Sequence, residues 1–306
     1  MSVALLFPGQ GTQHAAMLPW LEGSDAARPV LARMADALGA DWRVRLADTA
    51  WSQSNAVAQV LLTGTCVAAW RALAPRLPRV VAVAGYSVGE LASCVAAGML
   101  EADDALALAA RRAAAMDACV PDGSAGLLAL TDVGADDVAA ACARWGLHVA
   151  IRTGERRCIV GGPRAALAEA SAAIAARGAT ARPLCVRVPS HTPALRAAVP
   201  VFAHALAEVP WQAPRVAWVA GITGAVVREP ALVRQALADQ LATTIRWDAC
   251  MDTVAERRPG AVLEVGAGTT LARLWRERFP AVPVRSCDEF ASVDEVLGWV
   301  ATASGG

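Results

Sequence analysis

The stretch VVAVAGYSVGELASCVAAG, residues 80–98, decides how the rest of the chain is interpreted. Its apolar start is typical of a buried strand, and the small residues at its end are typical of a helix. Between them, GYSVG (85–89) fits the pattern G-x-S-x-G, in which a tight strand-to-helix turn exposes a serine hydroxyl. The amino terminus of the helix favours negative charge that develops there. We therefore interpret Ser87 as a nucleophile; the alternative is an ordinary turn.

Composition excludes several classes of function. With 306 residues, 56% of them hydrophobic, the chain is long enough for one large domain with a smaller insert. The formal net charge is zero, so no basic surface argues for nucleic acid. All 28 residues counted as Lys or Arg are arginine, which excludes Schiff-base chemistry on a lysine.

The chain shows no sign of export or of membrane insertion. Its start, MSVALLFPGQG, lacks the basic region and long apolar run of a signal peptide, and we expect no apolar run long enough to span a membrane. The eight cysteines are scattered without a C-x-x-C pair, which predicts mostly buried free thiols and no metal site. These features predict a cytoplasmic protein with no bound cofactor and neither a membrane nor a nucleic-acid partner.

Strand and helix patterns alternate along most of the chain. Apolar runs at 3–7 and 79–85 are typical of buried strands, and helical patterns lie between and after them, which predicts a parallel sheet covered on both faces. After residue 123 the order changes to β-α-β-β-α-β, the ferredoxin-like arrangement. We therefore predict an α/β protein with a large subdomain, residues 1–123 and 191–306, and a ferredoxin-like insert, residues 124–190.

Three local expectations accompany this assignment. The last strand of the insert should cover 181–188, and one helix should cover about 192–208. SVDE at 292–295 predicts a capping box that opens the last helix.

A serine nucleophile needs a base, and the chain has four histidines. His191 follows the last expected strand of the insert, between two prolines, and strand ends are where α/β folds place functional groups. His14 lies near a glycine-rich loop and is a second candidate for a residue that lines the site. His148 and His204 fall within an expected strand and helix, and we interpret both as structural.

Two further stretches could contribute to a binding site. In FPGQGTQ (7–13), glycines on both sides of Gln10 would expose its backbone N–H to a ligand, although the spacing matches no nucleotide-binding loop. Arg111 and Arg112 lie in one alanine-rich helix and should face different ways, one toward solvent and one toward a cleft. An arginine in a cleft is well suited to bind a carboxylate.

Together, these motifs resemble the malonyl-CoA:acyl-carrier-protein transacylase family over nearly the whole chain. FPGQGTQ resembles the opening loop of that family, and GYSVGE (85–90) resembles its nucleophile motif, G-H-S-x-G-E. RRAAAM selects Arg112, four residues before a methionine, and VPSH contains the histidine at His191. QLATTIRW (240–247) and LEVGAGTTL (263–271) resemble late motifs. The resemblance implies an α/β-hydrolase-like large subdomain with a ferredoxin-like insert.

The resemblance also implies a ping-pong mechanism. His191 would take the proton of Ser87, which attacks the thioester of malonyl-CoA, and the backbone N–H groups of Gln10 and Val88 would hold the oxyanion. A backbone carbonyl at Gln240 would orient the histidine.

Substrate and acceptor follow from the same resemblance. Arg112 would bind the free malonyl carboxylate, because an acyl group ending in methyl would leave that cation unpaired. The acceptor would be the phosphopantetheine-type thiol of an acyl carrier protein.

Departures from the family pattern suggest one branch of it. Tyr86, the only tyrosine in the chain, replaces the usual histidine before the nucleophile. NAVAQVLL (55–62) replaces a stretch that usually contains T-Q-P, and Arg157 stands where a glutamine is usual. A tyrosine before the serine resembles the epsilon subunit of malonate decarboxylase, whose carrier subunit bears a phosphoribosyl-dephospho-CoA arm. The alternatives are a fatty-acid or polyketide transacylase, a serine hydrolase or thioesterase, and a non-catalytic docking subunit.

Overall fold

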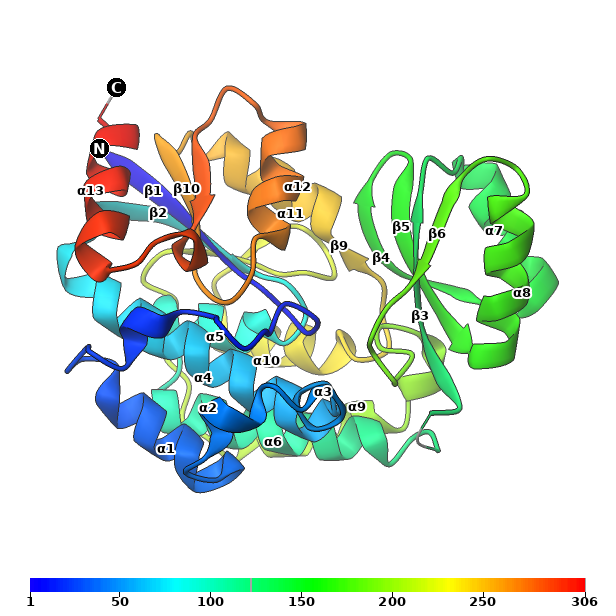
Figure 1. Ribbon diagram of the computed structural model, residues 1–306, viewed down its shortest axis with the longest axis horizontal. Coiled ribbons are helices and arrows are strands. Elements are labelled where there is room, and N and C mark those ends of the chain that lie inside the picture. The colour runs from blue at the N-terminus through cyan, green and yellow to red at the C-terminus, as the bar shows by residue number, and fades with distance from the viewer. Residues whose placement is uncertain (122, 306) are drawn as a thin grey trace.

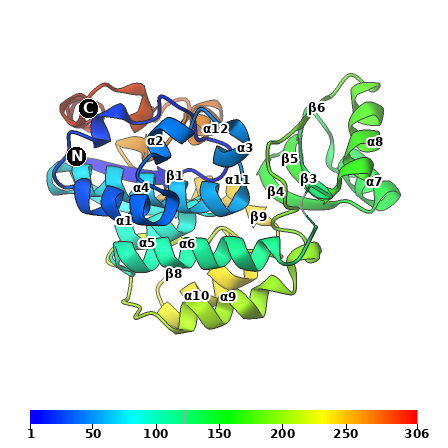
Figure 2. The same cartoon turned by 60° about the horizontal axis from the view of Figure 1, so that its bottom comes forward.

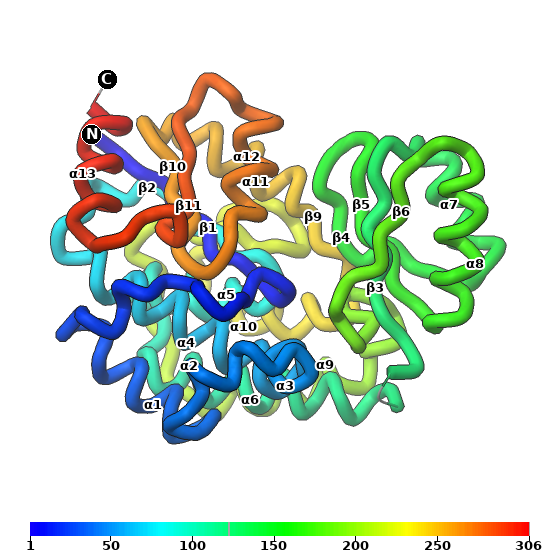
Figure 3. Tube along the Cα trace, viewed as in Figure 1, coloured from blue at the N-terminus to red at the C-terminus, as the bar shows by residue number. Residues whose placement is uncertain are grey.

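The computed structural model describes residues 1–121 and 123–305 and shows two α/β parts, each built on its own sheet (Figure 1). Asp122, in the turn at which we expected the insert to begin, and Gly306, the last residue of the expected large subdomain, lie outside the described residues. The two ends of the described chain lie close together on the larger part (Figure 3), where a Cβ at Gly305 would lie 3.7 Å from the Met1 side chain.

The larger part is built on a six-stranded sheet in the order β11-β10-β1-β2-β7-β8. Five of its strands are parallel, and β8 pairs antiparallel to β7 at one edge. The central strands are buried apolar runs, as expected for a parallel sheet covered on both faces. The strands are β1 Ser2–Phe7, β2 Arg79–Gly85, β7 Ala217–Val219, β8 Val226–Val227, β10 Ala261–Glu264 and β11 Val284–Ser286.

Helices cover this sheet, and Figure 2 shows α6, α9 and α10 as a further layer beneath it. The helices of the larger part are α1 Arg28–Leu38, α2 Trp42–Arg45, α3 Thr49–Ser52, α4 Asn55–Leu73, α5 Gly89–Ala96, α6 Ala102–Asp117, α9 Ala198–Ala207, α10 Pro230–Asp239, α11 Trp247–Glu256, α12 Thr270–Arg278 and α13 Val293–Ala303.

The expectation that no apolar run reaches the length of a membrane span was wrong for α4. The helical stretch Asn55–Arg76 is long and apolar enough to cross a membrane, and within the described residues it is the one such helix. However, 78% of its most apolar window is buried inside the protein. Its hydrophobicity is that of a core helix, because it packs between α1, α5 and α6.

The smaller part confirms the ferredoxin-like arrangement. Its sheet has the order β6-β3-β5-β4-β9, and all pairs among the first four strands are antiparallel. Two helices, α7 Ala135–Trp145 and α8 Arg164–Ala175, cover the face turned away from the larger part (Figure 1). The strands are β3 Ala125–Thr131, β4 His148–Gly154, β5 Arg157–Pro163, β6 Thr180–Pro183 and β9 Ile245–Arg246.

The fifth strand of this sheet, β9, was not expected from the sequence. It comes from outside the insert, just before α11, and pairs parallel to β4. This pairing joins the insert to the larger part at a third place, besides the two chain crossings, and so helps to fix one wall of the space between the sheets.

The three local expectations need correction. The last strand of the insert ends at Pro183, because the chain then leaves the edge of the sheet to reach the larger part, where the His191 N–H bonds to the Leu241 carbonyl. The helix expected from 192 begins as a separate 3-10 turn, Pro193–Leu195, ahead of α9.

The capping box at 292–295 is only half formed. The Ser292 hydroxyl accepts from the Glu295 N–H at 3.2 Å, but the Glu295 carboxylate accepts from Ala291 instead of Ser292. A complete capping box, which the sequence analysis missed, occurs at Ser286 and Glu289.

The turn between β2 and α5 depends on its two glycines. Ser87 has a φ of 58°, in the left-handed region that non-glycine residues rarely adopt. A Cβ at Gly89 would lie within 2.6 Å of the Pro8 carbonyl oxygen and closer still to that of Phe7. A Cβ at Gly85 would overlap the backbone of Glu90. The strand end and the helix start can therefore approach this closely only without side chains.

Replacing Gly89 by alanine should force β1 and α5 apart. We expect Gly89→Ala to lower the free energy of unfolding by about 2–4 kcal/mol, measured by urea titration, because backbone atoms cannot move aside as a flexible side chain would. Gly298→Ala is the matched control, since a Cβ there meets nothing within 4 Å, and it should stabilise α13 by up to about 1 kcal/mol. Equal unfolding energies for the two variants would contradict this interpretation of the turn.

Candidate active site

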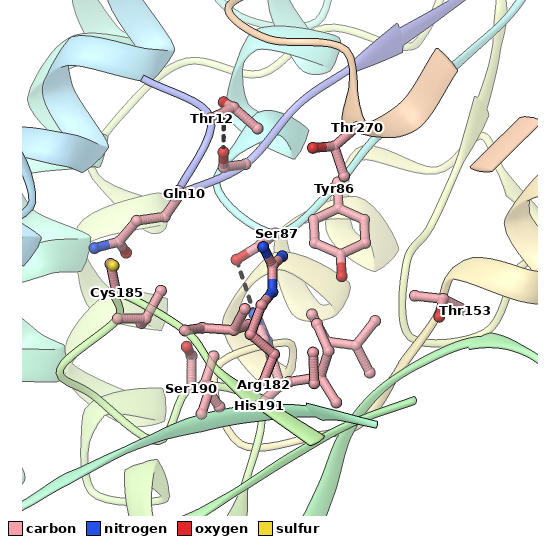
Figure 4. A pocket seen from close by; sticks show the side chains of 18 of the residues that line it. Gln10, Thr12, Tyr86, Ser87, Thr153, Arg182, Cys185, Ser190, His191 and Thr270 are labelled. Carbon is pink, nitrogen blue, oxygen red and sulfur yellow. Dashed lines mark hydrogen bonds between the residues drawn. The ribbon is translucent and has the colours of Figure 1, made fainter. Parts of the chain in front are cut away.

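A cavity of about 670 Å³ lies between the two sheets. The loop after β1, the β2–α5 turn and the start of α12 form one side of it, and strands of the small sheet form the other. Figure 4 shows Gln10, Ser87, Arg182 and His191 around this space. Because parallel strands place their carboxyl ends at one edge of a sheet, β1 and β2 bring Gln10 and Ser87 together there.

Ser87 and His191 meet at the bottom of the cavity. The Ser87 Oγ lies 2.8 Å from His191 Nε2 (Figure 4). His191 is 1% exposed and, like Ser87, has a positive φ, of 63°. Residues held in such a rare backbone conformation are common at sites where side chains must point in a fixed direction.

The second nitrogen of His191 faces the backbone of Gln240. Nδ1 lies 2.6 Å from the Gln240 carbonyl oxygen, which can only accept, so Nδ1 carries the proton and donates to it. Nε2 is then free to accept the proton of the Ser87 hydroxyl. A backbone carbonyl thus takes the position that a carboxylate occupies in a Ser-His-Asp arrangement.

His191 is held in its neutral form. Burial and the charge of Arg112 together lower the pKa of His191 to about 3, although the bond to Gln240 opposes both effects. A neutral imidazole is the form that can take a proton, so this environment keeps the histidine ready as a base at any pH well above 3.

Gln10 and Val88 present free backbone N–H groups beside the serine. Among the described residues, neither N–H donates to a protein acceptor, while the neighbouring Gly89 and Glu90 N–H groups bond within the turn. Two unpaired donors near a serine hydroxyl can stabilise a negatively charged oxygen.

Arg112 lies behind the serine and is 2% exposed. Its Nη1 donates to Gln59 Oε1 at 2.7 Å, and its Nη2 donates to Gln240 Oε1 at 2.8 Å. Nη2 also lies 3.5 Å from Ser87 Oγ. Arg111, by contrast, is exposed and pairs with Glu208, so the two arginines face different ways on α6.

Arg112 is a buried cation that pairs with no carboxylate within the described part of the chain. Burial lowers the pKa of Arg112 to about 10, while the charge of Glu90 raises it. The arginine therefore remains charged at neutral pH, and its hydrogen bonds go to neutral groups.

Sequence reasoning missed Gln59 and Glu90. Gln59 lies in NAVAQVLL, which we interpreted as a departure from the family pattern, although its amide contacts both Arg112 and Asn55. Two polar residues four apart on one face of an otherwise apolar helix were the available signal. Glu90 stood in the quoted nucleophile motif without a role, yet it is 1% exposed and bonded to Gln240.

The remaining candidate residues lie elsewhere. His14 pairs with Asp288 and does not line the cavity. His148 and His204 are exposed, and His204 pairs with Glu208. The cysteines are free, and most are buried, but Cys185 is exposed and lines the cavity.

Comparison with known proteins identifies the family. Residues 4–294 match the acyl transferase domain family. The chain belongs to this family. It is therefore an acyltransferase, and its two-sheet fold is the one seen in related structures.

Curated relatives and solved structures match along nearly their whole length. The chain is 32% identical over 301 residues to the malonyl CoA-acyl carrier protein transacylase of Mycobacterium bovis, which covers 96% of this chain and 99% of the relative. The acyl-carrier-protein S-malonyltransferase structure from Burkholderia pseudomallei matches with a TM-score of 0.88 at 32% identity, over 97% of this chain and all of the other. The structure of the malonyl-CoA:acyl carrier protein transacylase from Xanthomonas oryzae matches with a TM-score of 0.89 at 30% sequence identity. The match covers 97% of this chain and 98% of the other.

The low pKa of His191 predicts an unusual pH profile for Ser87. Acylation by p-nitrophenyl acetate, an uncharged ester, should change by less than about twofold between pH 5 and 7, because the imidazole stays neutral throughout. In Arg112→Ala, the pKa of His191 should rise, because the positive charge that disfavours its protonated form is removed. The acylation rate should therefore begin to fall at a higher pH than in the wild type. Ser87→Ala supplies the background. A rate that falls tenfold per pH unit below about 6.5 would show an ordinary histidine instead.

Proposed function

We propose that this acyltransferase moves a malonyl group from malonyl-CoA to the thiol of a carrier protein through an ester on Ser87. The observation that carries the proposal is Arg112, a buried cation whose Nη2 lies 3.5 Å from the serine oxygen and whose partners are neutral amides. An acyl group bound at Ser87 with a free carboxylate would supply the missing charge. The malonyl transacylase relatives support the same substrate.

In the first half of the reaction, the Ser87 oxygen attacks the thioester carbonyl carbon while its proton passes to His191 Nε2. The negative oxygen that results would accept hydrogen bonds from the Gln10 and Val88 N–H groups. The carbon–sulfur bond then breaks, and His191 returns the proton to the departing CoA sulfur. The Gln240 carbonyl stabilises the imidazolium that forms in between.

The second half reverses these steps with a new thiol. The carrier thiol gives its proton to His191, and its sulfur attacks the malonyl ester. Ser87 leaves with that proton, so the enzyme returns to its starting state. No metal or bound cofactor takes part in the proposed steps, which need only a thioester donor and a thiol acceptor.

Arg112 would select the acyl group. A malonyl carboxylate can form charge-assisted hydrogen bonds with the guanidinium once the Gln59 and Gln240 amides yield part of their contacts. An acetyl group of the same shape would end in a methyl and would leave the buried cation without a countercharge. Selectivity therefore follows from the cost of a buried unpaired charge.

The mouth of the cavity suits an anionic substrate. Arg157, Arg182 and Arg273 all line it, and Arg182 projects from β6 into the cavity (Figure 4). Among the residues that the structure describes, one carboxylate, that of Glu277, pairs with Arg157 and Arg273. The phosphates of CoA or of a phosphopantetheine-type arm would meet an excess of positive charge here.

The carrier is of the fatty-acid or polyketide type in our first proposal, because the relatives described above carry the name of acyl carrier protein transacylases. The carrier subunit of malonate decarboxylase is the second candidate, favoured by Tyr86. This residue lines the cavity next to Ser87, and its ring packs edge-on against Trp247 at 5.2 Å between centroids. In either case we propose a cytoplasmic protein.

Incubation with labelled malonyl-CoA and acetyl-CoA tests the proposal. Malonyl-CoA should label Ser87 in the wild type and not in Ser87→Ala. Arg112→Ala should lower the malonyl acylation rate roughly 100-fold, the cost of losing a buried charge interaction, and lower the acetyl rate much less. Arg111→Ala is the control on the same helix and should match the wild type. Equal labelling by both thioesters in the wild type would refute the role of Arg112.

A second experiment decides between the acceptors. The malonyl enzyme is offered a carrier protein with a phosphopantetheine arm and one with a phosphoribosyl-dephospho-CoA arm. We expect transfer to the phosphopantetheine carrier to be at least about tenfold faster, a difference of about 1.4 kcal/mol. The reverse preference, reduced in Tyr86→His, would establish the malonate decarboxylase acceptor.

A further inference from the structure

Glu90 is a buried carboxyl group beside the site that the proposed mechanism does not use. It is the second residue of α5 and is 1% exposed. Its Oε1 accepts from the Gly221 N–H at 2.5 Å, and its Oε2 accepts from the Gln240 Nε2. Both oxygens therefore face N–H donors, a geometry that suits the ionised form. Burial raises the pKa of Glu90, and the bonds from Gly221 and Gln240 and the charge of Arg112 oppose that rise.

We propose that Glu90 is a positioning residue that fixes the side-chain amide of Gln240, so that the amide oxygen faces Arg112 and no carboxylate neutralises that cation before the acyl group arrives. This inference rests on the proposed function, since it concerns how Arg112 is kept available for a malonyl carboxylate.

The chemistry of an amide gives the reason. A glutamine side chain has one accepting end and one donating end, whereas an ionised carboxylate only accepts and a guanidinium only donates. With Glu90 on one side and Arg112 on the other, one orientation satisfies both neighbours: Nε2 toward Glu90 and Oε1 toward Arg112. The reversed amide would set donor against donor at Arg112 and acceptor against acceptor at Glu90.

Gln240 also separates the two charges. If Glu90 paired directly with Arg112, the cation would already have its countercharge, and a substrate carboxylate would gain little by binding there. With the amide between them, Glu90 still raises the pKa of Arg112 through space, yet the hydrogen bonds of the guanidinium go to neutral oxygens. The arrangement therefore keeps Arg112 charged and leaves its hydrogen bonds to neutral amides, which a substrate carboxylate can displace.

One residue thereby joins the two halves of the site. The side chain of Gln240 contacts Arg112, and its backbone carbonyl contacts His191 Nδ1. Glu90 holds this residue from behind and is itself fixed by the backbone at Gly221, just after β7. Loss of Glu90 should therefore change the preference for malonyl over acetyl groups. A variant that only lowers stability should leave that preference unchanged.

The variant Glu90→Gln is the first test. Its amide can still accept from Gly221, but its NH₂ would face the Gln240 Nε2 and favour reversal of the Gln240 amide. We expect the ratio of malonyl to acetyl labelling of Ser87 to fall at least about tenfold, as for a lost hydrogen bond to a charged group. Because both labels are measured on one preparation, this ratio does not depend on the fraction of folded protein.

A second variant disturbs Glu90 without changing it. A Cβ at Gly221 would lie 2.7 Å from Glu90 Oε1, its nearest neighbour, and Gly221 does not have the positive φ that would exclude alanine. Gly221→Ala should therefore push the carboxylate and lower the same ratio. The control is Glu264→Gln, which removes another fully buried carboxylate that accepts from the Ala272 N–H and lies outside the cavity. It should lower stability and leave the ratio as in the wild type.

The outcomes separate this inference from the proposed function. A wild type that takes no label from malonyl-CoA contradicts the proposed function itself. If the wild type is labelled, and the ratio of malonyl to acetyl labelling in both Glu90→Gln and Gly221→Ala equals that of the wild type, only the role of Glu90 is contradicted. A ratio that falls equally in Glu264→Gln would show a merely structural effect and would likewise overturn the inference.

Discussion

The site depends on the burial of one positive charge next to Ser87. Arg112 is held inside the protein by two glutamine amides, with its guanidinium against Ser87. Keeping a cation in this position costs free energy, and in the proposed reaction an acyl group that brings a carboxylate would offset that cost. The same charge lowers the pKa of His191, so the residue proposed to choose the substrate also keeps the proposed base neutral.

The fold supplies the rigid frame that such a charge needs. The parallel sheet places the loop after β1 and the β2–α5 turn at one edge, and the glycines of that turn let α5 begin almost against β1. The small sheet closes the opposite side of the cavity, and β9 ties it to the larger part. Ser87 and His191 then share one cavity with the arginines that line its mouth.

Much of this arrangement could be predicted from the sequence. The two-part architecture follows from hydrophobic periodicity, because strand and helix patterns are local. The neighbours of Ser87 were expected through ordered motifs, and the structure brings His191, Gln240 and Arg112 to it. What motifs could not supply is the direction of side chains that depend on contacts distant in sequence, such as Gln59 toward Arg112 or Glu90 toward Gln240. The end of β6 at Pro183 and the pairing of β9 with β4 were missed for the same reason, since both depend on where another segment lies.

In the proposed reaction, the acyl carboxylate replaces neutral amides on Arg112. The most direct test is a crystal structure of the protein trapped as its acyl enzyme with malonyl-CoA. We expect an ester on Ser87 whose free carboxylate lies within hydrogen-bond distance of both Nη atoms of Arg112, with Gln59 or Gln240 displaced from its present contact. An ester whose carboxylate points toward Arg157 and Arg182 at the mouth, with the amides still on Arg112, would contradict it.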